Sequence, residues 1–340
     1  MMKNGNFDER DLLRASDILK SNDKWCIFTH VKSDGDALGS GSALFEAAII
    51  SGKIVEWYSP DEKFPEVYKY LNHFEDLRTS EDFTFKNDGT LYIFLDCSTE
   101  CRSVSGFDAN AGINSLNIDH HEDNTNYAKI NCVDGFASST CEMLYRVFTA
   151  GEWEINRDMA ESLYTGIITD TGSFSFSNTS PLTHKIAAEL IKIGVDVGMM
   201  TNRIGQNKCP EDFLIWSKAL SRVKVFGPEN IFAVSMVYTD DFSETGADLT
   251  STEGLSQMLM SLRGVKLAAF ATEHKDGVIR LSVRSREGSP FGAGEFARDF
   301  GGGGHEKAAG CTFPYPAEKA LDELEKSILK KYNECNITHQ

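Results

Sequence analysis

Short apolar runs separated by helical patterns occupy the first half of the chain. Nearly continuous apolar runs at 25–29, 53–58, 91–95 and 114–118 are typical of buried strands. Apolar positions at helical spacing mark the stretches 8–20, 37–50, 137–150, 156–169 and 183–194. Alternating strands and helices predict an α/β fold whose sheet is doubly wound and mostly parallel.

A second set of elements begins near residue 231. Apolar runs predict strands at 231–238, 266–272 and 278–284, and helices are expected at 251–262 and 316–332. The stretch 196–225 is helical in pattern but interrupted by Gly205 and Pro210. With 340 residues, two domains are expected. We place the first domain at 1–195, a helical connector at 196–228 and a smaller α/β domain at 229–340.

Charge and composition narrow the range of partners. The formal net charge is −17, which argues against binding long duplex nucleic acid but allows a small anion held in a pocket. No apolar run is long enough to span a membrane, and the first residues lack the apolar core of a signal peptide, so we expect a cytoplasmic protein without a membrane partner. The eight cysteines are scattered and predict neither a disulfide framework nor a zinc knuckle.

Acidic and imidazole side chains follow several predicted elements. They are His30, Asp34, Asp36, Asp96, Asp119, His120, His121 and Asp170. His30, Asp96 and Asp119 each stand at the carboxyl end of a predicted strand, where doubly wound sheets bind their ligands. Each group has an ordinary alternative: a solvated turn around Gly35, a helix cap at Asp96, a helix end at Asp170, or packed histidines. That all of these acids and imidazoles gather at one sheet edge by chance is much harder to accept than any single ordinary explanation.

The donor set itself predicts metal chemistry. It is rich in oxygen, contains some imidazole and has no thiolate, which suits Mn²⁺ or Mg²⁺ better than Zn²⁺. Four carboxylates in one place would repel one another unless about two divalent cations neutralised them. Two such ions about 3.5–4 Å apart are the usual arrangement for hydrolysing phosphate esters.

These residues also resemble a known family. The segments His30-Val-Lys-Ser-Asp34-Gly-Asp36, Asp96, Asp119-His120-His121 and Asp170-Thr-Gly resemble the four motifs of the DHH phosphoesterases. Three later segments resemble a DHHA1 domain: Ser282-Val-Arg284-Ser285-Arg286, the run Gly301 to Gly304 with His305, and Ala308-Ala309-Gly310. The layout is most similar to the stand-alone bacterial nanoRNase and pAp phosphatase type, which is related to exopolyphosphatases.

The resemblance implies a role for each motif residue. One Mn²⁺ would be held by His30, Asp34 and Asp96, and a second by Asp36, Asp96, His120 and Asp170, with Mg²⁺ as the other cation to consider. Asp119 would orient the site and His121 would contact the scissile phosphate. The active site would lie in the cleft between the two domains.

The second domain would hold the substrate. The resemblance implies that Arg284 and Ser285 grip a phosphate, that Gly302, Gly303 and Gly304 offer backbone N–H groups to it, and that His305 faces the metals. The expected substrates are short oligoribonucleotides, cleaved to mononucleotides, and pAp, converted to AMP. Linear or cyclic dinucleotides and polyphosphate stay open as alternatives, as does a non-catalytic nucleotide-binding module. A homodimer is a plausible assembly.

Overall fold

The chain folds into two compact units that divide between residues 207 and 208. The computed structural model describes residues 8–81, 83–86, 88–108, 112–205, 208–304 and 306–338. Helix α6 (Val197–Gly205) belongs to the first unit and α7 (Pro210–Ser221) to the second. The predicted connector of residues 196–228 therefore falls on both sides of the division, and its bounds stay a prediction.

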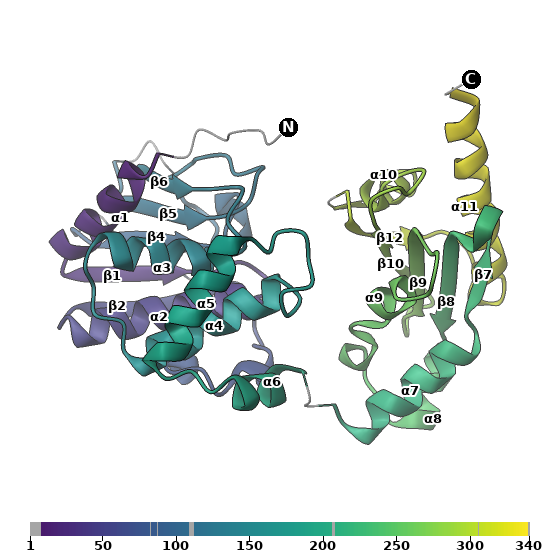
Figure 1. Ribbon diagram of the computed structural model, residues 1–340, viewed down its shortest axis with the longest axis horizontal. Helices are drawn as coiled ribbons and strands as arrows, with labels where there is room; N and C mark the ends of the chain where they lie inside the picture. The colour runs from purple at the N-terminus through teal and green to yellow at the C-terminus, as the bar shows by residue number, and fades with distance from the viewer. Residues whose placement is uncertain are drawn as a thin grey trace. The chain divides into compact units, whose positions relative to one another are not determined.

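The first unit is built on a six-stranded parallel sheet (Figure 1). Its strands are β1 (Lys24–Phe28), β2 (Ile54–Ser59), β3 (Leu77–Thr79), β4 (Leu91–Leu95), β5 (Ser115–Asp119) and β6 (Ile130–Val133). The order β3-β2-β1-β4-β5-β6 confirms the predicted doubly wound sheet. The short edge strands β3 and β6 were not predicted. The strand order reverses between β1 and β4, which is where such sheets bind ligands.

Helices cover one face of this sheet and aromatic loop residues cover the other. The helices of the unit are α1 (Arg10–Ser21), α2 (Gly35–Ile50), α3 (Thr140–Ala150), α4 (Arg157–Asp170) and α5 (Pro181–Ile193), with α2, α3 and α4 in front of the sheet in Figure 1. In β4, Leu91, Ile93 and Leu95 join the core under the helices. Tyr92 and Phe94 point the other way, as alternation along a strand requires, into a cluster with Phe83, Phe85, Phe107 and Tyr127.

Glycines bring α2 and α4 unusually close together. A Cβ atom added to Gly39 would lie 2.5 Å from the backbone oxygen of Ser162 on α4, and one added to Gly35 would lie 2.5 Å from Thr169 Oγ1. Gly35 is thus required for close helix packing, whereas the sequence suggested a tight turn. Because α2 begins next to Asp36 and α4 ends at Asp170, this packing draws the two carboxylates together.

The second unit has a mixed six-stranded sheet in the order β11-β12-β10-β9-β8-β7. Its strands are β7 (Lys224–Phe226), β8 (Phe232–Val237), β9 (Leu267–Glu273), β10 (Ile279–Ser285), β11 (Gly303–Gly304) and β12 (Ala308–Phe313). Strands β8 and β9 pair in parallel, and the other described neighbours in this sheet pair antiparallel. Strands β9 and β10 form an antiparallel pair, and in the turn between them Gly277 N donates to His274 O.

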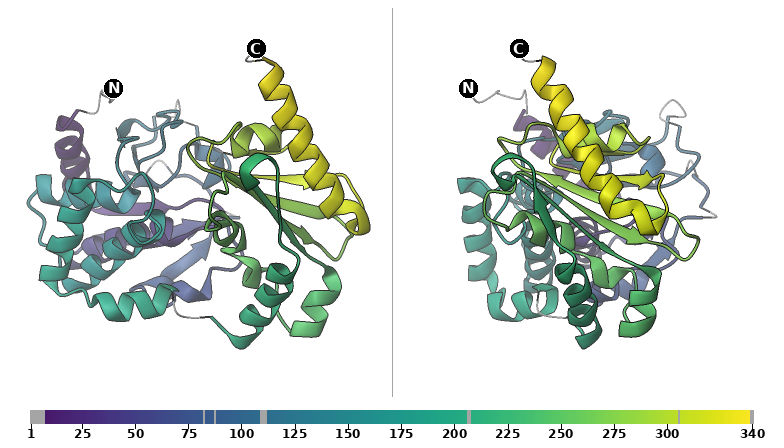
Figure 2. Two further views of the ribbon diagram at one scale, coloured as in Figure 1. Left: turned by 45° about the vertical axis from the view of Figure 1, so that its right-hand side comes forward. Right: turned by 90° about the vertical axis from the view of Figure 1, so that its right-hand side faces the viewer.

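Two helical layers sandwich this second sheet. One face packs on α10 (Ala293–Arg298) and α11 (Ala317–Thr338), and Figure 2 shows α11 running across that face. The other face packs on α7 and α9 (Leu255–Met260), while α8 (Thr239–Thr245) follows β8. Short 3₁₀ helices lie in the connections of both units, at Glu66–Tyr68, Phe74–Asp76, Glu100–Arg102, Pro228–Asn230 and Thr250–Thr252. Among the described residues, no helix is both long and apolar enough to cross a membrane.

Candidate metal centre and active site

The first motif occupies the connection from β1 to α2. His30 follows β1 and is buried, and its Nδ1 lies 2.8 Å from the backbone oxygen of Val31. Because a carbonyl oxygen can only accept a hydrogen bond, His30 Nδ1 must carry a proton and donate it to Val31 O. Nε2 then faces the acids. Asp34 caps α2, since its Oδ1 accepts from the backbone N–H groups of Asp36 and Ala37 at 3.1 Å. The Asp34 side chain is more than half exposed and lies 3.8 Å from His30 Nε2.

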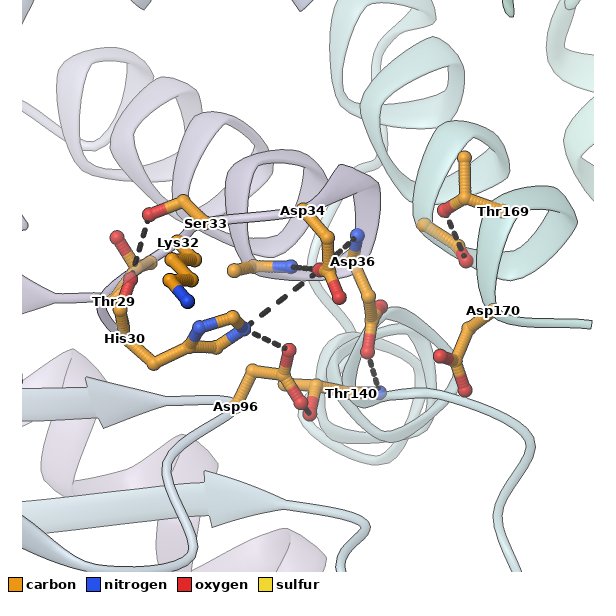
Figure 3. A network of polar contacts seen from close by, with 12 residues as sticks. Thr29, His30, Lys32, Ser33, Asp34, Asp36, Asp96, Thr140, Thr169 and Asp170 are labelled. Carbon is orange, nitrogen blue, oxygen red and sulfur yellow. Dashed lines mark hydrogen bonds and ion pairs between the residues drawn. The ribbon is translucent and has the colours of Figure 1, made fainter. Parts of the chain in front are cut away.

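Asp96 stands at the end of β4 beside this segment (Figure 3). Its Oδ2 lies 3.2 Å from His30 Nε2, and its Oδ1 accepts from Thr140 Oγ1 at 3.1 Å. The side chain is buried and the residue has a φ of 58°, in the left-handed region that non-glycine residues rarely adopt. Such strain persists only where surrounding contacts maintain it, and it gathers at functional sites. Asp96 does not cap a helix, which was the ordinary alternative.

The N-terminus of α3 receives the carboxylate of Asp36. Thr140 N donates to Asp36 Oδ2 at 2.6 Å (Figure 3). Cys141 N donates to Asp36 Oδ1 at 2.9 Å. These N–H groups belong to the first turn of the helix, where they have no intrahelical acceptor and attract negative charge. The helix end therefore holds a buried carboxylate in one orientation.

His120 lies among three carboxylates without a hydrogen bond to any of them. Its Nε2 is 3.8 Å from Asp36 Oδ2, 3.6 Å from Asp96 Oδ1 and 3.6 Å from Asp170 Oδ2. These distances exceed hydrogen-bond length, but two ligands of one cation lie about 3.0–4.2 Å apart when the metal–ligand bonds are near 2.1 Å. His120 Nδ1 lies 3.3 Å from Ala137 O, so both His30 and His120 turn Nδ1 to a carbonyl and Nε2 to acids, as metal-binding histidines do.

Within the described part of the chain, three groups of side chains could each hold a metal ion, because the donor atoms of each group lie within 4.8 Å of one another. They are His30, Asp34 and Asp96; Asp36, His120 and Asp170; and Asp96, His120 and His121. Every predicted metal ligand belongs to at least one group, and Asp96 and His120 each belong to two. The donor chemistry and spacing therefore fit divalent cations that share ligands.

The electrostatics of this cluster reflect an excess of negative charge. Burial raises the pKa of Asp170 to about 6, and burial followed by the charge of Asp96 raises the pKa of Asp36. Burial by itself would lower the pKa of His120, yet the surrounding carboxylates outweigh it and raise this pKa to about 9. Without cations, protons on imidazole and carboxylate groups thus offset part of the charge that metal ions would neutralise.

Asp119 makes its contact with His121. Its Oδ1 lies 2.8 Å from His121 Nδ1, and its Oδ2 accepts from Asn124 Nδ2 at 2.5 Å. The Asp119 side chain is fully buried at the end of β5. Asp119 therefore fixes the ring orientation of His121, the residue expected to contact the phosphate.

Strand β10 of the second unit carries the predicted phosphate-binding residues. Arg284 is partly buried, and burial lowers the pKa of its guanidinium. Its Nη1 donates to Val283 O at 3.1 Å, and no carboxylate among the described residues lies within ion-pair distance. The Ser285 hydroxyl is already occupied, since it donates to Glu306 O at 2.8 Å and accepts from Ala293 N at 3.1 Å. These contacts do not support Ser285 as a substrate ligand.

The glycine run has two parts: Gly302 is hydrogen-bonded within the fold, whereas Gly303 and Gly304 are exposed. Gly302 N donates to Ala297 O at 2.9 Å, so the N–H expected to face an anion is used within the fold. Gly303 and Gly304 form β11, opposite Gly310 and Ala309, and both are exposed. Gly303 has open space where a Cβ would lie. His305 lies outside the described residues.

Comparison with known proteins agrees with this geometry. Residues 24–167 match the DHH family, N-terminal domain, and residues 230–334 match the DHHA1 domain. The bifunctional oligoribonuclease and PAP phosphatase NrnA of Thermus thermophilus is 31% identical over 291 residues, covering 84% of this chain and 83% of the relative. The chain belongs to the DHH family. Membership confirms the resemblance seen in the motifs and the predicted enzyme class, a phosphoesterase.

Further matches extend over most of this DHH chain. The protein of the same name from Bacillus subtilis is 29% identical over 309 residues, covering 87% of this chain and 92% of the relative. The crystal structure of an exopolyphosphatase-related protein from Bacteroides fragilis has a TM-score of 0.88 at 23% identity, covering 98% of this chain and all of the other. That structure shows that the fold is shared.

Several residues that shape this DHH site escaped the sequence analysis. Thr140 binds both Asp36 and Asp96, Asn124 holds Asp119, and Asn178 contacts Asp170. The run Ser138-Ser139-Thr140 indicates the start of a helix. Because helix N-termini attract anions, a carboxylate at this position could have been predicted. Asn178 offered no comparable signal, because its contact depends on how the loop after α4 folds back.

Proposed function

We propose that this chain is a divalent-metal-dependent phosphoesterase that hydrolyses short oligoribonucleotides to mononucleotides and pAp to AMP. The observation that carries this proposal is the position of Asp96. Its carboxylate lies close to His30 and Asp34 on one side and close to His120 on the other. A carboxylate common to two ligand groups is what a bridged pair of cations requires. The names of the curated relatives point to the same substrates.

In this proposal, one cation is bound by His30, Asp34 and Asp96. The other is bound by Asp36, Asp96, His120 and Asp170. Mn²⁺ is our first choice and Mg²⁺ the second, because the ligands combine imidazole with many carboxylate oxygens. Bound cations would supply Lewis acidity and would neutralise the charge of the phosphate in the transition state.

The remaining roles belong to side chains that would contact substrate. His121, oriented by Asp119, would contact the scissile phosphate. Arg284 would bind another phosphate of the substrate, since a guanidinium without a carboxylate partner is well suited to a bidentate contact with an anion. The exposed backbone of Gly303 and Gly304 would lie beside that anion, and His305 would assist as the family motif implies. Ser285 and Gly302 would maintain the shape of this segment.

A substrate panel tests the proposal. The purified chain with Mn²⁺ would be offered RNA of two to five nucleotides, short DNA, pAp, a cyclic dinucleotide and polyphosphate, with products identified by mass. We expect mononucleotides from the short RNA and AMP from pAp. The proposal fails if short RNA and pAp stay intact while cyclic dinucleotide or polyphosphate is consumed. Binding of nucleotides without turnover of any substrate would indicate a non-catalytic module instead.

The proposal extends to the setting in which the enzyme works. We place it in the cytoplasm, acting on short oligonucleotides and small phosphorylated nucleotides instead of long duplexes. We also propose a homodimer. Fractionation of cells that produce the protein, light scattering of the purified chain and a duplex-binding assay test these three points.

A further inference from the structure

Asn178 lies outside the recognised motifs but contacts a proposed metal ligand. Its Nδ2 donates to the backbone oxygen of Asp170 at 3.1 Å and to that of Ser138 at 2.9 Å, and lies 3.4 Å from Asp170 Oδ2. All three partners are oxygens that only accept, at least when Asp170 is ionised. The nitrogen of the amide must therefore face them, which fixes the orientation of the whole group.

These contacts join two parts of the metal centre. Ser138 precedes Thr140, whose N–H binds Asp36 and whose hydroxyl binds Asp96. Asp170 ends α4, on a separate element. One side-chain amide thus connects Asp170 to the segment that holds the other two carboxylates.

An unusual turn brings Asn178 back to Asp170. Gly172, Ser173 and Phe174 have φ values of 54°, 55° and 64°, so three consecutive residues adopt the left-handed conformation. For each non-glycine residue this costs about 1–2 kcal/mol. The turn is held by Ser173 N donating to Ile168 O at 2.7 Å and by the Phe174 ring, whose centroid lies 5.0 Å from that of His184. The fold therefore maintains a costly backbone to place the following segment.

The other end of the same amide has no partner. Asn178 Oδ1 is buried, and no group among the described residues donates to it. An acceptor buried without a donor costs about 1–3 kcal/mol, so such atoms are expected where a ligand or ordered water supplies the missing hydrogen bond.

We propose that Asn178 is a positioning residue of the metal centre: its Nδ2 holds Asp170 in the orientation that the second cation requires. This inference rests on the proposed metal centre. It goes beyond that centre because Asn178 is not a ligand and would act through Asp170.

Calorimetric titration of the metal-free, full-length chain with Mn²⁺ tests the inference. For Asn178→Ala and the bulkier Asn178→Leu, we expect the dissociation constant of one Mn²⁺ site to rise by about 10–100-fold, the usual effect of removing a partner behind a ligand. The other site should change by less than about threefold. Turnover of a dinucleotide should fall at low Mn²⁺ and recover at high Mn²⁺, with KM unchanged.

Thr179→Val is the matched control, because the Thr179 hydroxyl is also buried without a partner but makes no hydrogen bond to Asp170. We expect its Mn²⁺ binding to match the wild type. If both Asn178 variants keep wild-type Mn²⁺ affinities while their Tm falls, Asn178 is only structural and the inference is wrong. An equal loss in Thr179→Val also overturns it, because the effect would belong to the loop. A wild-type chain that binds no Mn²⁺ would instead refute the metal centre itself.

Discussion

Asp119 Oδ1 lies 2.8 Å from His121 Nδ1, whereas the intervening His120 turns its Nε2 toward Asp36, Asp96 and Asp170. Both histidines follow β5 and their ring centroids lie 4.8 Å apart, yet their nitrogens meet different sets of acids, so one short segment serves two purposes. Both histidines belong to a group with Asp96 that could hold metal, but only His120 also belongs to the group with Asp36 and Asp170, whereas His121 is held by a fully buried carboxylate. The two histidines should therefore respond differently to substitution.

Asp119→Asn tests the pairing with His121. The amide keeps the size of the side chain but removes the negative charge beside the imidazole and puts an NH₂ group at either His121 Nδ1 or Asn124 Nδ2. We expect kcat to fall by about 10–100-fold while Mn²⁺ affinity changes by less than about threefold. Steady-state kinetics and Mn²⁺ titration provide the two readouts. Asp123→Asn, an exposed acid of the same loop, is the control, and equal kcat in both variants would refute the assigned role.

Asp96→Asn should have the largest effect on turnover. Its carboxylate is shared between two ligand groups, so neutralising it weakens both proposed cation sites at once. We expect turnover to fall by more than about 10³-fold and the bound Mn²⁺, measured by atomic absorption after gel filtration, to decrease. Glu62→Gln on the surface should change neither quantity. Full activity of Asp96→Asn would reject a two-metal mechanism.

Arg284→Ala should separate substrate binding from chemistry. Because Arg284 belongs to the second unit and is not among the residues that could bind metal, its loss should raise KM by about 10–100-fold with a smaller effect on kcat. Arg280→Ala is a matched control, since Arg280 lies four residues earlier on the same strand and is exposed. If both variants show the same KM, the guanidinium of Arg284 has no special role.

Gly39→Ala tests the close packing of α2 on α4. The new Cβ would lie 2.5 Å from Ser162 O, so the helices must move apart, at a cost of about 1–3 kcal/mol in the free energy of unfolding. The separation of Asp36 and Asp170 depends on the same packing, so Mn²⁺ affinity should fall as well. Gly205→Ala places a Cβ in open space within α6 and should leave both properties nearly unchanged. Urea unfolding followed by circular dichroism measures the difference.

The ion pair between Asp241 and Arg222 predicts a pH dependence of stability. Burial by itself would raise the pKa of Asp241, but hydrogen bonds from Arg222 at 2.5 and 2.8 Å and from Tyr238 N outweigh it and lower this pKa below its usual value. A lowered folded-state pKa means that the stabilisation is complete above the unfolded pKa of about 3.9 and is lost as pH falls through the folded pKa. The stability difference between wild type and Asp241→Asn should therefore be large at pH 6 and shrink below about pH 4.

Urea unfolding at several pH values measures this difference. Asp240→Asn, which alters the neighbouring exposed acid, is the control and should follow the wild type across the range. A difference for Asp241→Asn that stays constant from pH 6 to pH 3 would show that the ion pair is not its source.

The local pattern of apolar residues was sufficient to predict the main strands of the first unit. The apolar runs that became β1, β2, β4 and β5 are long enough to identify, and β1, β4 and β5 each lead to an acid or imidazole of the site. The edge strands β3 and β6 were missed because they are short and partly exposed, so neither length nor apolar character distinguishes them from loops. In the second unit, β11 consists of two glycines that form a strand only because β12 lies beside them.

The sequence by itself determined the chemistry available to this protein: the acids, the imidazoles, Arg284 of the β10 motif and the elements on which they stand. Tertiary structure decided how they are used. Only helix packing could bring Asp36 near Asp170, because α2 and α4 can approach this closely only where glycine has no Cβ atom to collide with the other helix. Only the folded backbone could show that Ser285 and Gly302 are occupied and that Asn178 joins Asp170 to Ser138. Residue types and their spacing can be read directly from the sequence, whereas hydrogen-bond partners depend on contacts between segments that lie far apart in it.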